Sequence, residues 1–197
     1  MLKSNKSLFV VLTIAMGAII IASNYLVQFP IHHFNLEKIL TYGAFSYPIT
    51  FLITDLANRR YGKIVARKLV VIGFVVGILL TLFVSTNFQD LISIRIAIGS
   101  GIAFIVAQLI DVEIFQVLRN RKWFVAPITS SFFGSLIDTF LFFSISFLGT
   151  GIPWISLAFG DLVVKLMLAL IMLVPFRILI IKISDIAHTK NKTASII

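Results

Sequence analysis

Six long runs of apolar residues, separated by short polar or charged segments, dominate the amino-acid sequence. Each run is near or above the ~20 residues that a helix needs to cross the hydrocarbon core of a bilayer. The runs are continuous rather than alternating, which is typical of membrane helices and not of barrel strands. The predicted helices cover residues 8–27, 39–56, 69–85, 93–118, 124–148 and 154–181. We therefore predict an all-α polytopic membrane protein in which residues 1–197 form a single transmembrane domain.

The composition favours a membrane protein over a soluble one. Hydrophobic residues make up 59% of the 197 residues and the mean hydropathy is +1.05, whereas an ordinary globular domain is roughly 45–50% apolar. Charged residues make up 13%, about half the usual share. A soluble protein of this size could not bury so much apolar surface. The first run lacks a small-x-small cleavage pattern, so we predict a retained helix rather than a signal peptide.

Basic residues gather at one side of the predicted helices. Fourteen of the 17 Lys and Arg residues fall before the first helix, in the second-to-third and fourth-to-fifth connections, or from Arg177 onward, at the end of the sixth helix and after it. Only Lys38 and Arg95 fall on the other side, and Lys165 falls inside the last helix. The positive-inside rule then predicts six membrane crossings with both termini in the cytoplasm. The net charge of +9 therefore indicates cytoplasmic loops rather than a nucleic-acid surface.

Several kinds of chemistry lack their residues in this sequence. It has no cysteine, and its histidines, His32, His33 and His188, fall in a predicted loop and in the tail. We therefore expect no metal centre, no bound cofactor and no nucleophile with its base at membrane depth. The motif G-x-x-x-x-G-K-[ST] is missing, so the chain cannot hydrolyse ATP itself. We predict a protein that is not an enzyme.

Polar residues inside the predicted helices are the candidates for function, because a charge in hydrocarbon costs about 2.5–3.5 kcal/mol on insertion scales. The candidate substrate-binding residues are Asn24, Gln108, Asp111, Asp138, Asp161 and Lys165. At a rise of about 1.5 Å per residue, those in the first, fifth and sixth predicted helices reach a similar depth, toward the outer side. Those in the fourth lie deeper.

Each candidate also has a structural interpretation. Asp161 and Lys165 are spaced i, i+4, so they can form an ion pair that lets their helix insert. Asp138 has no cation one turn away; it either pairs across helices with Lys165 or binds a ligand or proton. Gln108 and Asp111, spaced i, i+3, can instead hold neighbouring helices together.

The sequence also suggests partners or positions for other polar residues of the predicted helices. Asp55 precedes a basic loop and is expected to partner it. Glu113 is expected to snorkel or to pair with a neighbouring base. Ser131 and Ser135 share a helix face with Asp138, which predicts room for a small ligand against that face.

Four ordered motifs extend this picture. They are TYGAFSYPITFLITDL over residues 41–56, AQLID over 107–111, SFFGSLIDT over 131–139 and GDLVVK over 160–165. With these motifs the chain resembles the queuosine precursor transporters, also called the vitamin uptake transporter family. The resemblance implies import of 7-deazaguanine precursors of queuosine, in their 7-cyano and 7-aminomethyl forms.

Such a ligand suits the candidate residues. One carboxylate can accept both N–H donors of a guanine-like edge, and an amide such as Asn24 or Gln108 can meet its carbonyl and a ring nitrogen. An aromatic side chain, with Phe45 and Tyr47 as examples, can stack on the flat ring. An aminomethyl cation would favour a second carboxylate.

Two modes of transport are compatible with the sequence. We favour a self-sufficient secondary carrier, in which Asp138 or Asp111 exchanges protons. The alternative is a substrate-binding subunit that docks on an ATP-driven module through the small residues Ala15, Ala18 and Ala22. The predicted partners are the lipid bilayer, a small nucleobase-like substrate, and a second copy or an energising module.

Overall fold

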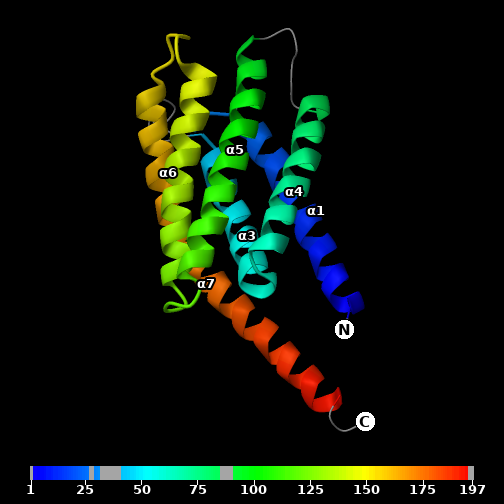
Figure 1. Cartoon of the computed structure of the whole chain (residues 1–197). Helices are drawn as coiled ribbons and strands as arrows, with labels where there is room; N and C mark the ends of the chain where they lie inside the picture. The colour runs from blue at the N-terminus through cyan, green and yellow to red at the C-terminus, as the bar shows by residue number, and fades with distance from the viewer. Residues whose placement is uncertain (1, 27–28, 32–40, 85–90, 195–197) are drawn as a thin grey trace.

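The computed structural model describes residues 2–26, 29–31, 41–84 and 91–194, with side chains described except at 2–8, 24, 80–82, 84 and 182–194. The helices in this part of the chain are α1 (Leu2–Leu26), α2 (Gly43–Ser46), α3 (Pro48–Tyr61), α4 (Lys63–Val84), α5 (Leu91–Leu118), α6 (Val125–Phe147) and α7 (Trp154–Ala194). The long helices lie side by side in one bundle (Figure 1). The prediction of an all-α fold is confirmed.

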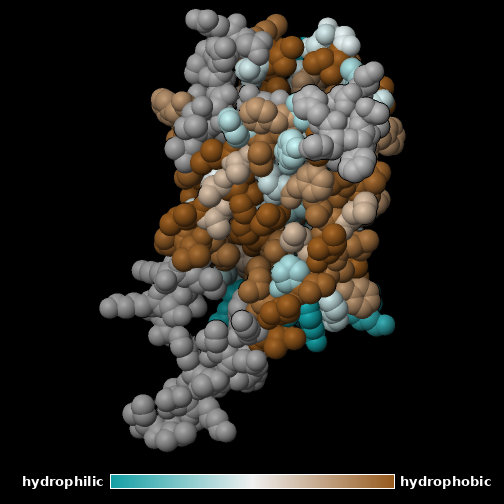
Figure 2. Space-filling model, turned by 180° about the vertical axis from the view of Figure 1, so that it is seen from behind, coloured by the Kyte–Doolittle hydropathy of each residue, from teal (hydrophilic) through white to brown (hydrophobic). Residues whose placement is uncertain are grey.

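The outer surface of the bundle is apolar. Three helical stretches in the described part of the chain are long and apolar enough to cross a membrane: α5, α6 and residues 154–181 of α7. Large apolar side chains are exposed along α1, α4 and α7, and brown covers most of the face in Figure 2. Because exposed apolar surface of this extent needs lipid as its solvent, the chain is a polytopic membrane protein.

Small residues let neighbouring helices approach closely. A Cβ added at Gly73 of α4 would lie 2.5 Å from the Met16 side chain of α1, and one added at Gly99 of α5 would lie 2.5 Å from Ser146 of α6. The most extensive contact in the bundle is the one between α5 and α6. Close backbone approach through small residues is the usual way in which membrane helices associate.

The second predicted helix, 39–56, differs from the structure. The chain forms the short helix α2 and then α3, which continues to Tyr61. Pro48 occupies the first turn of α3 and cannot donate the hydrogen bond that would join the two helices, although Tyr47 before it keeps helical dihedral angles. α3 ends at Gly62, whose φ of 84° is easily adopted by glycine alone.

The third predicted helix, 69–85, also begins earlier in the structure, at Lys63. The basic residues of its first turns have partners there: Lys63 lies 3.5 Å from Glu113 of α5, and Arg67 lies 2.5 Å from the same carboxylate. The expectation that Glu113 pairs with a neighbouring base is therefore confirmed. Charged residues that would end an apolar run in the sequence can thus belong to the helix.

The connections with most of the basic residues share one end of the bundle. The α3–α4 and α5–α6 connections lie there together with the first residues of α1 and the last residues of α7 (Figure 1). α7 continues past the apolar run 154–181 to Ala194, and Pro175 lies inside it. In membrane helices proline is tolerated because neighbouring groups satisfy the freed carbonyl.

Candidate functional site

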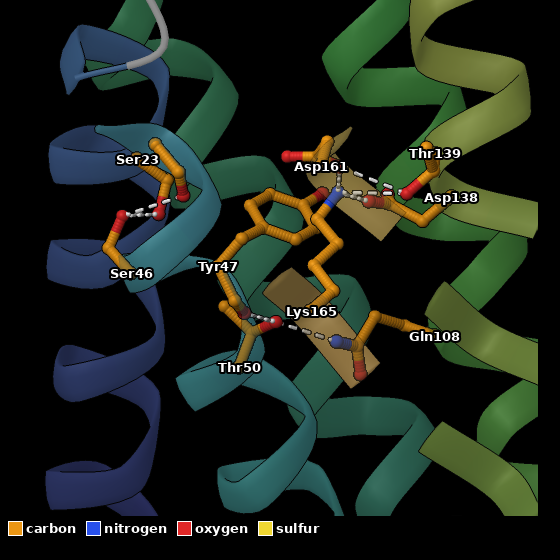
Figure 3. A network of polar contacts seen from close by, with 10 residues as sticks. Ser23, Ser46, Tyr47, Thr50, Gln108, Asp138, Thr139, Asp161 and Lys165 are labelled. Carbon is orange, nitrogen blue, oxygen red and sulfur yellow. Dashed lines mark hydrogen bonds and ion pairs between the residues drawn. The ribbon is translucent and has the colours of Figure 1, made fainter. Parts of the chain in front are cut away.

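One lysine and two aspartates meet inside the bundle, and with Thr139 we call them the lysine cluster. Lys165 Nζ of α7 lies 2.8 Å from Asp138 Oδ2 of α6 and 2.5 Å from Asp161 Oδ2, one turn earlier on α7. Thr139 of α6 donates to Asp161 Oδ2 at 3.0 Å and accepts from Lys165 at 3.2 Å (Figure 3). The three charged residues are only 2–4% exposed.

Spacing along one helix explains part of this cluster, and helix packing explains the rest. The i, i+4 spacing puts Asp161 and Lys165 on one face of α7, whereas Asp138 arrives from the neighbouring helix α6. The interpretation in which Asp138 pairs across helices with Lys165 is confirmed. A buried ion pair is stable only when its remaining donors and acceptors are bonded. Here the ammonium has three oxygen partners for its three N–H groups.

A small cavity of about 30 Å³ adjoins the lysine cluster. It is lined by Ser23, Gly43, Tyr47, Ser100, Asp138, Phe142, Asp161 and Lys165. Oδ1 of Asp138 and the hydroxyl of Tyr47 are both buried without a well-aligned hydrogen bond to the described residues, although the two groups are close enough to interact electrostatically. The site therefore presents a carboxylate oxygen and a hydroxyl, neither held by a well-aligned hydrogen bond, to a cavity with room for about two waters.

Tyr47 is the aromatic residue of the site. It stands at the break between α2 and α3, and its ring centroid lies 5.1 Å from Lys165 Nζ. A hydrogen bond of 2.9 Å between Ser23 of α1 and Ser46 of α2 holds this break against α1 (Figure 3). Phe45, the other aromatic residue considered from the sequence, is 46% exposed and does not line the cavity. Only the three-dimensional position distinguishes the two.

Gln108 is fully engaged in holding α5 against α3. Its Nε2 donates to Thr50 Oγ1 at 2.9 Å, and its Oε1 accepts from Thr54 Oγ1 at 2.6 Å. Thr50 in turn donates to the backbone carbonyl of Tyr47 at 2.7 Å. The structural interpretation of Gln108, as a polar contact between helices, is therefore the one that the geometry supports. Its placement in the substrate site remains a prediction, and Gln108 does not line the cavity.

Asp111 lies away from the lysine cluster, beside a second acid. Its carboxylate interacts with Asp55 of α3 and with Ser130 of α6. The expectation that Asp55 partners a basic loop is wrong, because this side chain is buried and faces Asp111 and Ser130 instead. Asn24 belongs to α1, but its side chain falls outside the described part of the structure.

Two serines that the sequence places on the face of Asp138 border a different space. Ser131 and Ser135 line a second cavity of about 10 Å³, together with Asp55. The other walls of the cavity beside Asp138 come from α1, α2, α5 and α7, and these serines do not line it. Thr139, which bridges Lys165 and Asp161, was not among the candidates; its place next to Asp138 in the sequence is the signal that could have indicated it.

The chain is similar to known proteins over most of its length. A protein-family model described as "Putative vitamin uptake transporter" matches residues 41–180. The chain is 37% identical to the "Probable queuosine precursor transporter" of Haemophilus influenzae, over 80% of this chain and 79% of that protein. It is 32% identical to the "Queuosine precursor transporter" of Escherichia coli, over the same shares. It is also similar to a "Probable queuosine precursor transporter" of Bacillus subtilis, with 28% identity over 68% of each chain. No solved structure matches the chain.

Proposed function

The chain belongs to the vitamin uptake transporter family, and from this premise we propose that it imports queuosine precursors of the 7-deazaguanine class across the bacterial inner membrane. Membership of a transporter family makes it a transporter and not an enzyme. One observation carries the proposal: Asp138 Oδ1 and the Tyr47 hydroxyl are buried beside a cavity, close to each other but without a well-aligned hydrogen bond to the described residues. Because buried polar groups are rarely left unpaired, such a place suits a polar ligand.

The unpaired groups fit the edge of a guanine-like ring. Lys165 already occupies Oδ2 of Asp138, so the two N–H donors of the edge are best shared between Asp138 Oδ1 and Asp161, which also lines the cavity. Tyr47 supplies a hydroxyl for a ring acceptor and an aromatic face for the ring. With two carboxylates and one ammonium the lysine cluster has a formal charge of −1. This charge favours the cationic 7-aminomethyl form over the neutral 7-cyano form.

Substrate entry requires the bundle to open. The cavity holds about two waters in the described conformation, which is too little space for a two-ring base. Tyr47, Asp138 and Asp161 all line this cavity. The break between α2 and α3 therefore lies where a small rotation would widen the cavity. We assign the opening movement to this break.

We further propose that the whole chain is one transmembrane domain with six crossings, in which α2 and α3 together form one interrupted crossing. The common position of the basic connections at one end of the bundle supports a cytoplasmic location for both termini (Figure 1). Reporter fusions at Asn35 and Gly149 should read as external, and fusions at Lys63 and Arg121 as internal. One reversed reporter would overturn this topology.

The energy source is proposed to be an ion gradient, used by a self-sufficient carrier. The alternative of an ATP-driven complex also has an observation in its favour, because Ala18 and Ala22 of α1 are exposed and leave a small-residue surface unpacked. Uptake by the purified chain in liposomes, with no other protein present, distinguishes the two modes. A strict requirement for a separate ATPase would support the subunit mode.

The central test is binding of 7-aminomethyl-7-deazaguanine to the purified protein in detergent. Asp138→Asn should weaken binding by more than about tenfold, since a hydrogen bond to a charged group contributes about 1.5–3 kcal/mol. Glu113→Gln is the matched control, because it removes a partly exposed acid that does not line the cavity. Adenine should compete poorly, since its edge offers a different donor pattern. Unchanged affinity in a folded Asp138→Asn protein would place the substrate elsewhere.

A further inference from the structure

Two buried aspartates from different helices meet away from the lysine cluster, and we call them the acid pair. Asp55 of α3 is 2% exposed and Asp111 of α5 is 0% exposed. The two carboxyl groups are near enough to interact with each other. Ser130 of α6 donates to Asp55 Oδ1 at 3.4 Å. Neither oxygen of Asp111 has a well-aligned hydrogen bond to the described residues.

The charged groups near the acid pair have partners other than Asp55 and Asp111. On α3, Arg59 donates its guanidinium to the backbone carbonyl of Arg119. On α4 and α5, Lys63 and Arg67 pair with Glu113. In the described part of the chain, neither member of the acid pair forms a salt bridge with a lysine or arginine.

Helices α6 and α7 complete the surroundings without adding a charge. α6 contributes Ser130 and, at the adjoining cavity, Ser135. α7 contributes Ala169, Met172, Leu173 and Phe176 to that cavity, all of them apolar. The charged residues of α7 on either side of these positions have other partners: Lys165 is held by the lysine cluster, and the Arg177 guanidinium lies 5.1 Å from the Trp123 ring centroid. Nothing described around the pair therefore compensates two negative charges.

Two neighbouring carboxylates in such an environment cannot both be ionised. Removing a single charge from water already costs several kcal/mol, and a second like charge nearby adds repulsion. Sharing one proton relieves both costs, because the protonated group can donate a hydrogen bond to the ionised one. We propose that Asp55 and Asp111 form a proton-binding site that couples substrate import to an inward proton gradient. This inference rests on the transport function proposed above.

A second observation supports a site at this position. The hydroxyl of Ser135 is buried and unpaired, and it lines the cavity of about 10 Å³ that also reaches Asp55. This volume corresponds to about one water. A water there would connect the acid pair to Ser135 and give a proton a hydrogen-bonded position outside the pair. The cavity is therefore the route by which we expect the proton to arrive.

The acid pair is linked to the substrate site through α3. From Tyr47 to Asp55 the chain advances eight residues, which is about 12 Å along a helix. Between them, Thr50 and Thr54 are hydrogen-bonded to Gln108, one turn before Asp111 on α5. A rotation of α3 that moves Tyr47 away from the substrate cavity therefore also changes the contact between Asp55 and Asp111. One movement of α3 would therefore change both the substrate cavity and the acid pair, which couples substrate binding to proton binding.

The test uses liposomes containing the full chain, with the membrane potential clamped at zero by potassium and valinomycin. An inward gradient of one pH unit is equivalent to a factor of about ten in concentration, so one coupled proton should concentrate 7-aminomethyl-7-deazaguanine about tenfold. Asp111→Asn should bind the substrate within about twofold of the unaltered protein and exchange it across the membrane. It should lose accumulation driven by the pH gradient.

Controls separate this inference from the proposed function. Glu113→Gln removes an acid from the same helix and should accumulate substrate normally. If the unaltered protein binds no 7-deazaguanine, the proposed function fails. If it binds and transports but responds to a sodium gradient and not to protons, only the coupling proposal fails. Full proton-driven accumulation by Asp111→Asn would also overturn it.

A measurement on the unaltered protein covers the case in which the variants do not fold. Infrared spectroscopy should detect a protonated carboxyl group in the substrate-free protein at neutral pH. The same band should be missing in Asp55→Asn or Asp111→Asn, whichever is stable. Absence of a protonated carboxyl group in the unaltered protein would rule out the proton site.

Discussion

The lysine cluster and the acid pair are both buried carboxylate sites, and helix α6 contributes to both, yet only the first contains a cation. In the lysine cluster, Lys165 holds two carboxylates in fixed positions. In the acid pair, Asp55 and Asp111 face each other without such a partner. A cation keeps carboxylates ionised and orients them, which suits recognition of a ligand. Carboxylates without a cation must take up a proton, which suits a change of charge during transport.

The largest expected effect is on stability in the lysine cluster. Lys165→Met leaves two carboxylates buried without their cation, and breaking a buried ion pair in this way costs about 3–5 kcal/mol. The free energy of unfolding in detergent should fall by that amount. The triple variant Asp138→Asn, Asp161→Asn, Lys165→Met should recover most of the loss while failing to bind substrate. A loss below about 1 kcal/mol for Lys165→Met would show that the cluster does not depend on its cation.

A smaller effect is expected between the two sites, at Gln108. Gln108→Leu removes two buried hydrogen bonds to α3, and the free energy of unfolding should fall by about 1–3 kcal/mol. Because Gln108 does not line the substrate cavity, substrate affinity in the folded variant should change by less than about threefold. A tenfold weaker affinity at unchanged stability would instead make Gln108 a substrate ligand. Equilibrium binding and unfolding on the same preparation decide between these outcomes.

Removal of the Tyr47 hydroxyl tests whether this group binds the substrate. Tyr47→Phe keeps the ring and removes only a hydroxyl that has no well-aligned hydrogen bond, so stability should be nearly unchanged. Affinity for 7-aminomethyl-7-deazaguanine should fall by about two- to tenfold, the effect of one hydrogen bond of about 0.5–1.5 kcal/mol. Phe45→Leu, two residues earlier and exposed, serves as the control. Equal affinities of Tyr47→Phe and the unaltered protein would exclude a hydrogen bond from this hydroxyl.

The smallest change in stability is expected at the acid pair. Replacing both Asp55 and Asp111 with Asn keeps their volume and removes an uncompensated buried charge, so the free energy of unfolding should stay within about 1 kcal/mol or rise. Thermal unfolding of the double variant measures this directly. A loss comparable with that of Lys165→Met would mean that the pair has a stabilising cationic partner. The acid pair would then resemble the lysine cluster in having a cation that compensates its charge.

Interactions within one helix could be read from the sequence. The i, i+4 spacing determines that Asp161 and Lys165 share a face, whatever the rest of the chain does. The apolar runs determine that the chain is helical and membrane-embedded, because lipid requires every backbone group to be bonded within the segment. The sequence also predicted that Glu113 pairs with a base, but its partners, Lys63 and Arg67, come from another helix.

Contacts between helices were decided by tertiary structure alone. Sequence spacing says which face of a helix a residue occupies but not which other helix meets that face. For this reason the sequence left open whether Asp138 faces Lys165 or a ligand, and it assigned Asp55 to a basic loop rather than to Asp111. It likewise could not choose Tyr47 over Phe45. The separation of the buried acids into one group with a cation and one without is a product of how the bundle packs.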